Sequence, residues 1–510
     1  MFNETHTLNG NRMYKWNEDR SLRMQAGYTH DVIRQQRGNT QVYYQPTDTI
    51  QIDETYHYHL RSDAANLELR YEDNSNRNYI SNRFTMDGEL NHGRSEELGQ
   101  TLRTSRLSAG NYFNLIRNRE SSTWEFRSAT QYAYQPASLL LEEGKSKFNQ
   151  HSFYTDNSAA YLRKYNGFTR QYKAGIQGER ATMRYTPPTQ PNDFNASNLS
   201  LYFNPYFQLQ RGKWLATLSL PLKAQRYFSQ QRSFLFFNPS TYLRYKLDYH
   251  WTFSLYGSLK RSAGDFSDLY PGLYQTDYRT WRSGNGLFPT STTQTYNLYG
   301  EYKNTVQEFF VTASLTYSRS NRNTLFEQSV SENAIVYTRR ELPNHSDSWN
   351  LSSTLSKGIY DWHLKTSLTL LLSRSNGEQL TRLADSDPQS LLQTYRYDYL
   401  KAEPKVIWSP ADLFEAEYHA TLGYGGSKIG SDTRLSPLLD FVQRLHLTFS
   451  IGQVDLRLSG EHYRNDLGEH THLNTVFADA SLIYKRKKWR LEASLNNLFN
   501  KKEYAYTTYS

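Results

Sequence analysis

Seven of the nine tryptophans in this 510-residue chain lie within a few residues of a short polar turn that joins two strands of alternating hydrophobicity. Two of them precede their turns, Trp16 and Trp408, and five sit just after them: Trp124, Trp214, Trp251, Trp362 and Trp489. A soluble protein has no reason to collect its largest amphipathic side chains at one end of every hairpin. A membrane β-barrel has one, because its strands turn back at a common level where indole rings form a girdle between hydrocarbon and headgroups.

The segments between these turns alternate apolar and polar residues, which is the period of a β-strand with two different faces. In 453–461 one face carries Val454, Leu456, Leu458 and Gly460, and the other carries Asp455, Arg457, Ser459 and Glu461. The range 362–373 follows the same pattern around Leu364 and Leu368, with Leu371 as the exception. Such strands run for about ten residues or more, the length that a tilted strand needs to cross a bilayer. If they do, Leu364, Leu368, Leu456 and Leu458 face acyl chains and not a second layer of protein.

Tight turns and long loops alternate along the chain. Turns are expected near eleven residues, 35 to 57 apart: Asp19, Ser62, Arg119, Asn166, Gly212, Asp248, Thr305, Gly358, Ala411, Gly452 and Lys487. Longer connections rich in Gly, Pro, Asn and Ser lie between them, for example 184–199, 262–293, 320–346, 374–393 and 426–439. Two strands per turn predict an all-β, antiparallel up-and-down transmembrane barrel of about 22 strands. Its short turns would be periplasmic and its long loops external.

The amino-acid composition favours a membrane β-barrel over a helical membrane protein. Hydrophobic residues make up 37% of the chain and the mean hydropathy is −0.81, yet aromatic residues reach 15%. No apolar run approaches the roughly 18–20 residues of a membrane-spanning helix, so a helical membrane protein is excluded. A chain that is polar on average and rich in tyrosine fits a wall in which every second residue faces a wet lumen.

The charge balance and the absence of cysteine restrict partners and chemistry. Lys and Arg exceed Asp and Glu by nine, which indicates affinity for anionic lipid headgroups, lipopolysaccharide or an anionic solute. The basic residues are spread along the chain, so nucleic acid is not an expected partner. Zero cysteines exclude disulfides, thiolate metal sites and cysteine nucleophiles.

A soluble β-propeller is the strongest competing fold, because its repeats span about 40–50 residues. It predicts four short strands per repeat and a recurrent signature. This chain has two long strands per period, a drifting spacing and no repeated dipeptide, so we favour the barrel.

No motif of an active site is evident. The chain has no phosphate-binding glycine loop, no Gly-x-Ser-x-Gly elbow and no His-Glu-x-x-His. His57 with His59, and His470 with His472, could each share a metal, but neither pair has an evident third ligand. We therefore expect no catalysis, no metal site and no cofactor.

The most distinctive loop, 264–282, gathers aromatic and basic residues in a polar segment. As a ligand platform acting through stacking and cation–π contacts it would use Tyr270, Tyr274, Tyr278, Arg279, Trp281 and Arg282. Alternatively the loop folds on itself and needs the rings as its own small core, which is the interpretation we favour. The four-residue spacing of the tyrosines also fits a short helix after Pro271-Gly272.

The last hairpin resembles a known family. Asn496-Asn497-Leu498-Phe499-Asn500-Lys501, followed by Tyr504, looks like the penultimate-strand motif of TonB-dependent outer-membrane receptors. The segment from Leu269-Tyr270-Pro271-Gly272 to Asp277-Tyr278-Arg279 is more weakly similar to a loop of such receptors. The resemblance implies a 22-stranded barrel in the bacterial outer membrane, an internal plug, a TonB box, and import of siderophores, vitamins or glycans.

The chain departs from that family at both ends. Met1 to His6 does not resemble a signal peptide, no plug or TonB box precedes the barrel, and the chain stops at Tyr509-Ser510 one strand early. We therefore expect residues 1–510 to form one barrel domain without a plug, a fragment that is incompletely closed along 488–504. Its partners would be outer-membrane lipid, a surface lipoprotein, and the TonB complex only if missing sequence supplies the plug and TonB box.

The function predicted on this basis is that of the barrel region of a TonB-dependent receptor for nutrient uptake. Two alternatives stay open. One is an outer-membrane barrel without a plug, such as a porin or a structural protein. The other is a soluble secreted β-protein that binds glycans.

Overall fold

The protein, seen in a computed structural model, is almost entirely β-strand. The structure describes residues 2–44, 49–75, 77–95, 99–141, 144–186, 192–276, 279–331, 334–383, 390–430, 433–468, 471–486 and 489–501. The first half contains β1 (Phe2–Lys15), β2 (Arg20–Tyr44), β3 (Thr49–Asn74), β4 (Asn78–Ser95), β5 (Gln100–Arg119), β6 (Ser122–Leu141), β7 (Gly144–Tyr165), β8 (Phe168–Thr186), β9 (Asn192–Arg211), β10 (Trp214–Ser219), β11 (Leu222–Tyr227), β12 (Arg232–Phe237), β13 (Ser240–Lys246) and β14 (Trp251–Ala263). The second half contains α1 (Phe266–Leu269), β15 (Leu273–Gln275), β16 (Thr280–Ser283), β17 (Thr290–Asn304), β18 (Phe309–Val330), β19 (Ile335–Ile359), the 3-10 helix η1 (Tyr360–Trp362), β20 (Leu364–Leu383), β21 (Leu391–Ala411), β22 (Phe414–Ile429), β23 (Thr433–Arg434), β24 (Leu438–Ile451), β25 (Val454–Gly468), β26 (Thr471–Arg486) and β27 (Trp489–Leu495).

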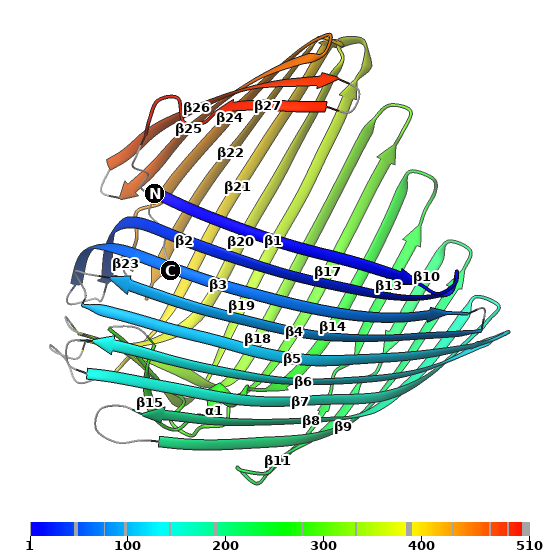
Figure 1. Ribbon diagram of the computed structural model, residues 1–510, viewed down its shortest axis with the longest axis vertical. Helices are drawn as coiled ribbons and strands as arrows, with labels where there is room; N and C mark the ends of the chain where they lie inside the picture. The colour runs from blue at the N-terminus through cyan, green and yellow to red at the C-terminus, as the bar shows by residue number, and fades with distance from the viewer. Residues whose placement is uncertain are drawn as a thin grey trace.

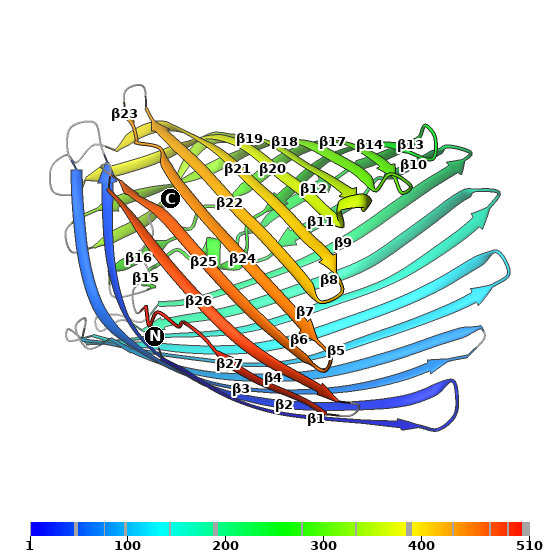
Figure 2. The ribbon, with the colours of Figure 1, turned by 90° about the horizontal axis from the view of Figure 1, so that it is seen from above.

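Neighbouring wall strands pair antiparallel in chain order, and the sheet curls round a central space (Figure 1, Figure 2). Two wall strands are interrupted, because β10 and β11 both pair with β9 while β13 and β12 pair with β10 and β11. The interruptions fall at Leu220-Pro221 and Asn238-Pro239, where proline offers no amide hydrogen to the ladder. With each interrupted strand counted once, and β15, β16 and β23 outside the wall, the described part of the chain forms 22 wall strands. The predicted up-and-down barrel is confirmed.

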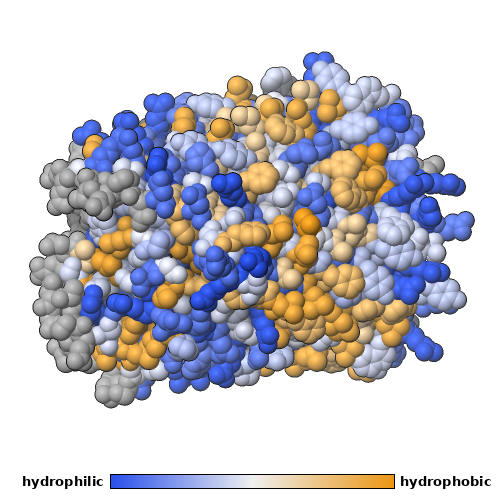
Figure 3. Space-filling model, turned by 90° about the horizontal axis from the view of Figure 1, so that it is seen from below, coloured by the Kyte–Doolittle hydropathy of each residue, from blue (hydrophilic) through white to orange (hydrophobic). Residues whose placement is uncertain are grey.

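The wall has an apolar outer face. On β20 the outward positions are Leu364, Thr366, Leu368, Leu370 and Leu372, and their partners on β21 are Trp408, Val406, Pro404, Ala402 and Leu400. At a rise of about 3.3 Å per residue this row covers about 26 Å of strand, or about 20 Å of depth at a 40° tilt, close to the apolar band of a membrane barrel. Leu456 and Leu458 are exposed and Leu364 and Leu368 are half-exposed, so none lies beneath a second protein layer. On the face drawn in Figure 3, apolar residues gather toward the turn side between hydrophilic residues at both ends.

Nine of the eleven predicted turns lie at one end of the barrel, the turn predicted near Lys487 falls outside the described residues, and the turn predicted at Ser62 is wrong. Ser62 lies inside β3, opposite Asp31 and Asn91. Its polar neighbour Asp63 is held within the wall, where it accepts hydrogen bonds from Tyr28, His30 and Arg61 at 2.7, 2.7 and 3.1 Å. The turn falls instead between β3 and β4, where the Ser75 hydroxyl donates to the carbonyl of Asn78 at 3.0 Å.

Much of the sequence expected to be loop is strand. The range 320–346 consists largely of the upper ends of β18 and β19, which continue beyond the depth that a bilayer requires. A bulge between Arg322 and Thr324 interrupts their register. Above it β16 pairs with β19, and β18 with β20, in parallel. The hairpins extend because backbone pairing satisfies the peptide groups in water as it does in lipid.

The described part of the sheet ends in two edge strands, β1 and β27. In the described ranges, no hydrogen-bonded pairing joins β1 to β27, as expected for an incompletely closed barrel. β27 has seven residues, all exposed, and among the described strands it pairs with β26 alone. Across the same ranges, no helix is long and apolar enough to span a membrane.

Candidate functional site

The connection between β14 and β17, residues 264–289, folds inward at the loop end of the barrel; we call it the mouth loop. Its base closes through the amide of Gly264, which donates to the carbonyl of Pro289 at 2.9 Å. Phe266, Leu269, Tyr270 and Phe288 then pack into one buried cluster with inward-facing residues of β8, β9 and β11: Ala181, Met183, Tyr185, Ala196 and Tyr227. Gly284 is required here, because a Cβ would lie 2.2 Å from the carbonyl oxygen of Asp268.

The opposite side of the mouth loop is fixed to the extended β18–β19 hairpin. β16 adds to β19 in parallel, with Thr280 opposite Ile335. The guanidinium of Arg279 donates to the carbonyl of Ser331 at 2.9 Å. Arg339 Nη2 donates to Asp268 Oδ1 at 2.5 Å. The mouth loop therefore connects β8–β11 to β18–β19 across the inner side of the wall.

The polar part of the mouth is a cluster of two arginines, one aspartate and one phenylalanine. Arg282 and Arg339 lie 4.6 and 4.3 Å from the ring centre of Phe326. Asp268 accepts from Arg339 and lies 4.0 Å from Arg282. Arg339 is buried, whereas about half of the Arg282 side chain is exposed. The cluster keeps one positive charge in excess, in a form that suits an anionic or aromatic solute.

The structure places the six predicted ligand residues in different environments. Tyr270 and Arg279 are buried, Tyr270 in the cluster and Arg279 against Ser331. Tyr274 and Trp281 are half-buried, and Arg282 is exposed. Tyr278 lies outside the described residues. Binding of a ligand by these residues stays a prediction.

Aromatic contacts explain the burial of the tyrosines. The Tyr270 ring meets Phe194 edge-on at 5.9 Å between centroids, and Tyr274 stacks on Phe148 at 5.9 Å. Burial raises the pKa of Tyr270 to about 12 and raises that of Tyr274 above its ordinary value, so both are neutral phenols at physiological pH. Tyr270 thus belongs to the core of the loop, and Tyr274 packs against that core.

The helix predicted after Pro271-Gly272 is wrong. The helical turn is α1, before this pair, and the residues after it form β15. Proline disfavours helix in the residue that precedes it, and Tyr270 is extended, so the turn ends there. Tyr270 and Tyr274 pack against wall residues, and their spacing is not the period of a helix.

Phe326 and Arg339 were missed as members of this site. They are 44 and 57 residues from Arg282 along the chain, in a segment that reads as a surface loop. The β18–β19 hairpin pairs Phe326 with Arg339, and the parallel addition of β16 to β19 brings Arg282 beside them. Neither pairing leaves a local signal in the sequence.

The seven tryptophans predicted to form a girdle lie at the turn end of the wall. Their exposed fractions range from 39 to 74%. Their contact with lipid headgroups stays a prediction. His57 and His59 are exposed on β3, His470 lies outside the described residues, and no group of three potential metal ligands occurs within the described ranges.

Comparison with known proteins gives similarity of structure only. No family model matches the sequence, and no curated protein matches it. The chain is similar to the siderophore receptor PirA from Pseudomonas aeruginosa, with 11% identity, 97% of this chain and 80% of that chain covered, and a TM-score of 0.53. It is also similar to a mutant of the ferric enterobactin receptor PfeA from Pseudomonas aeruginosa (12%, 96% and 78%, 0.57) and to the outer membrane transporter YddB from Escherichia coli (8%, 97% and 75%, 0.55). At these identities the similarity establishes a shared fold.

Proposed function

We propose, from a fold shared with TonB-dependent outer-membrane receptors, that this chain forms the wall and entrance of a nutrient-uptake protein in the outer membrane of a Gram-negative bacterium. The supporting observation is an apolar outer face about 20 Å deep that encloses a polar lumen with an inward-folded mouth loop. The wall supplies the passage. The mouth loop narrows it and presents the first side chains that a solute would meet.

The chemistry of the mouth favours an anionic solute with aromatic or planar groups. Arg282 is exposed over Phe326, and the half-buried rings of Tyr274 and Trp281 lie in the same loop. Guanidinium groups bind carboxylates and phenolates through charge-assisted hydrogen bonds, while aromatic rings provide stacking surface. Anionic metal chelates combine these features, so they are the solute class we propose. Coupling to TonB would drive their uptake.

The uptake proposal is tested in whole cells. The complete gene product is made in a Gram-negative host that lacks its own ferric-siderophore receptors. Cells are then supplied with radioactive iron bound to catecholate, hydroxamate or citrate ligands. We expect accumulation of at least one complex, abolished by a protonophore. If the iron complex accumulates equally with and without the protonophore, the protein acts as a porin and the proposal is refuted.

Membrane location is tested separately. An unboiled sample in detergent should migrate differently from a boiled one, and tryptophan fluorescence should be quenched by bromine placed high on the acyl chains. A soluble protein without a heat-dependent shift would refute the barrel in the membrane and favour a secreted glycan-binding protein.

The role of the mouth is tested with Arg282→Gln. This variant should weaken uptake of the anionic complex and leave folding intact, because Arg282 is exposed and Asp268 keeps Arg339. Lys303→Gln, which removes one exposed cation at the turn end, is the matched control. Equal uptake by the two variants would remove Arg282 from the site.

A further inference from the structure

The outer face of β18–β22 changes from apolar to cationic over three successive rows of paired residues toward the loop end. The first row is Leu315, Leu351, Leu372, Leu400 and Tyr424. The second is Tyr317, Trp349, Arg374, Asp398 and Gly426. The third is Arg319, Asp347, Asn376, Arg396 and Lys428, after which Arg434 of β23 pairs with Lys428. The rows mark the boundary between hydrocarbon and headgroups on the side of the long loops.

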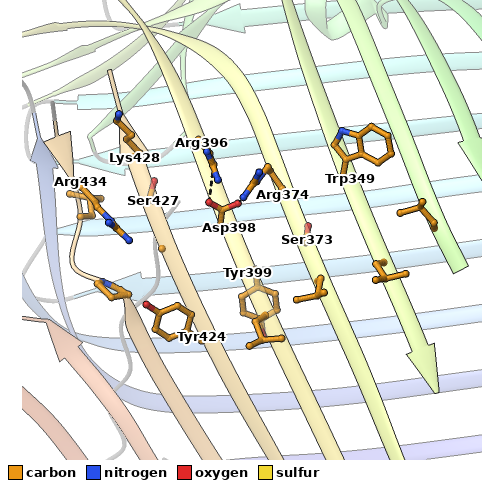
Figure 4. A pocket seen from close by; sticks show the side chains of 17 residues that line it. Trp349, Ser373, Arg374, Arg396, Asp398, Tyr399, Tyr424, Ser427, Lys428 and Arg434 are labelled. Atoms are coloured by element: carbon orange, nitrogen blue, oxygen red, sulfur yellow. Dashed lines mark hydrogen bonds and ion pairs between the residues drawn. The ribbon is translucent and has the colours of Figure 1, made fainter. Parts of the chain in front are cut away.

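A groove follows this boundary. Its volume is about 1060 Å³, roughly that of 35 water molecules at about 30 Å³ each, so it holds far more than a single inorganic ion. Figure 4 shows Arg374, Arg396, Lys428 and Arg434 along its loop side, and Tyr424 on the side toward the membrane. The groove therefore offers cations to a headgroup and an apolar row to acyl chains.

The cations outnumber the carboxylates that line the groove. Asp398 is its one acidic residue, and it accepts from Arg374 at 2.6 Å and from Arg396 at 2.8 Å. Lys428 and Arg434 are exposed and form no ion pair with any residue that the structure describes. Four cations against one carboxylate leave three positive charges beside the hydrocarbon layer, where an unneutralised charge is unfavourable. Phosphate groups at headgroup level would neutralise them.

We propose that this groove binds a phosphorylated, multiply acylated glycolipid of the outer leaflet, namely the lipid A part of lipopolysaccharide. A headgroup phosphate lies among Arg396, Lys428 and Arg434, and acyl chains follow Leu372, Leu400 and Tyr424. Arg374 holds Asp398 away from the phosphate. The inference rests on the proposed location in the outer membrane and is independent of the solute that the barrel carries.

The test compares three proteins in zwitterionic detergent. They are the unmodified chain, R396Q/K428Q/R434Q, and the control R119Q/R163Q/K164Q, which removes the same charge from exposed residues at the turn end. The first triple variant keeps the contact between Arg374 and Asp398, so no carboxylate loses both partners. Lipid A with two phosphates is titrated, and bound lipid is counted by native mass spectrometry.

We expect the unmodified chain and the control to bind one lipid A with equal affinity. The groove variant should bind roughly a hundredfold more weakly, because each cation near an anionic lipid contributes about fivefold. Dephosphorylated lipid A should bind all three proteins equally weakly.

Equal lipid A binding by the groove variant and the control would overturn the proposal. So would equal binding of phosphorylated and dephosphorylated lipid. A change confined to the oligomeric state would overturn it in favour of a second copy of the chain. Uptake is measured in separate cells, so a failure of uptake with lipid binding retained would refute only the proposed function.

Discussion

Leu370 and Leu371 are adjacent on β20 and face opposite sides of the wall, so they provide an internal test of what surrounds the barrel. Leu370 points outward opposite Ala402, whereas Leu371 points into the lumen opposite Lys401. We compare Leu370→Arg with Leu371→Arg. The two variants lose the same side chain and gain the same charge, and they place that charge on opposite faces of the wall.

The expected loss of folding stability follows from the depth of each substituted residue in the bilayer. The outward row runs from Leu364 to Leu372, so its middle residue is Leu368. Leu370 lies two residues away, about 5 Å of depth at a rise of 3.3 Å per residue and a 40° tilt. An arginine at the midplane of a barrel's lipid face costs about 2–4 kcal/mol, falling to about 0–1 near the interfaces. Leu370→Arg should therefore cost about 2 kcal/mol. Leu371→Arg should cost less than about 1 kcal/mol, because water in the lumen solvates the new charge.

The assay is denaturant titration of barrels folded into phosphatidylcholine vesicles. The folded fraction is measured by tryptophan fluorescence and by the mobility of unboiled samples in gels. Unequal costs in the stated order support an outer face in lipid and an inner face in water. Equal costs, or a larger cost for Leu371→Arg, would refute this assignment of the faces and the membrane location with it.

Two further predictions concern the mouth loop and one turn. Tyr270 is buried, and its hydroxyl has no hydrogen-bond partner among the described residues. Tyr270→Phe should therefore change the stability of the mouth loop by less than about 1 kcal/mol, whereas Tyr270→Ala should cost about 3–5 kcal/mol. Protease cleavage within 264–289 should accelerate only in the alanine variant. In the turn before β14, amide donors of Trp251 and His250 hold the pKa of Asp248 below its ordinary value. The stabilisation by Asp248 is therefore complete above the ordinary carboxyl pKa of about 3.9 and is lost as the pH falls through the lower folded value. The difference in denaturation midpoint between the unmodified chain and Asp248→Ala should be constant from pH 5 to 7 and shrink below pH 4, and a difference that grows on acidification would contradict this reasoning.

Local patterns in the sequence predict the wall well. The alternation in 362–373 and 453–461 fixes which residues share a face, and the turns at Asn166, Gly212 and Gly452 follow from residues that tolerate positive φ. The turn predicted at Ser62 is wrong because the polar dipeptide Ser62-Asp63 has the composition of a turn, although it lies in a strand of the wall. Hydrogen bonds to Asp63 from Tyr28 and His30, on a different strand, keep it in the sheet.

The mouth could not be predicted to the same extent. Its aromatic and basic composition is visible in 264–282, and the expectation of an internal core was sound for Tyr270. The pairing of Asp268 with Arg339 joins residues 71 positions apart, and it lies beyond a bulge that shifts the register between β18 and β19. Such contacts are set by the tertiary course of the hairpins, which periodicity does not encode.

The attachment of the mouth loop at both ends has a mechanical consequence. Since β8–β11 and β18–β19 are joined through the same 26 residues, the loop acts as a tie between two arcs of the rim. The rim cannot widen by separation of those arcs without breaking the contact of Arg339 with Asp268 or that of Arg279 with Ser331. The aperture at this side therefore adjusts through rotation of exposed side chains such as Arg282, while the two arcs keep their spacing.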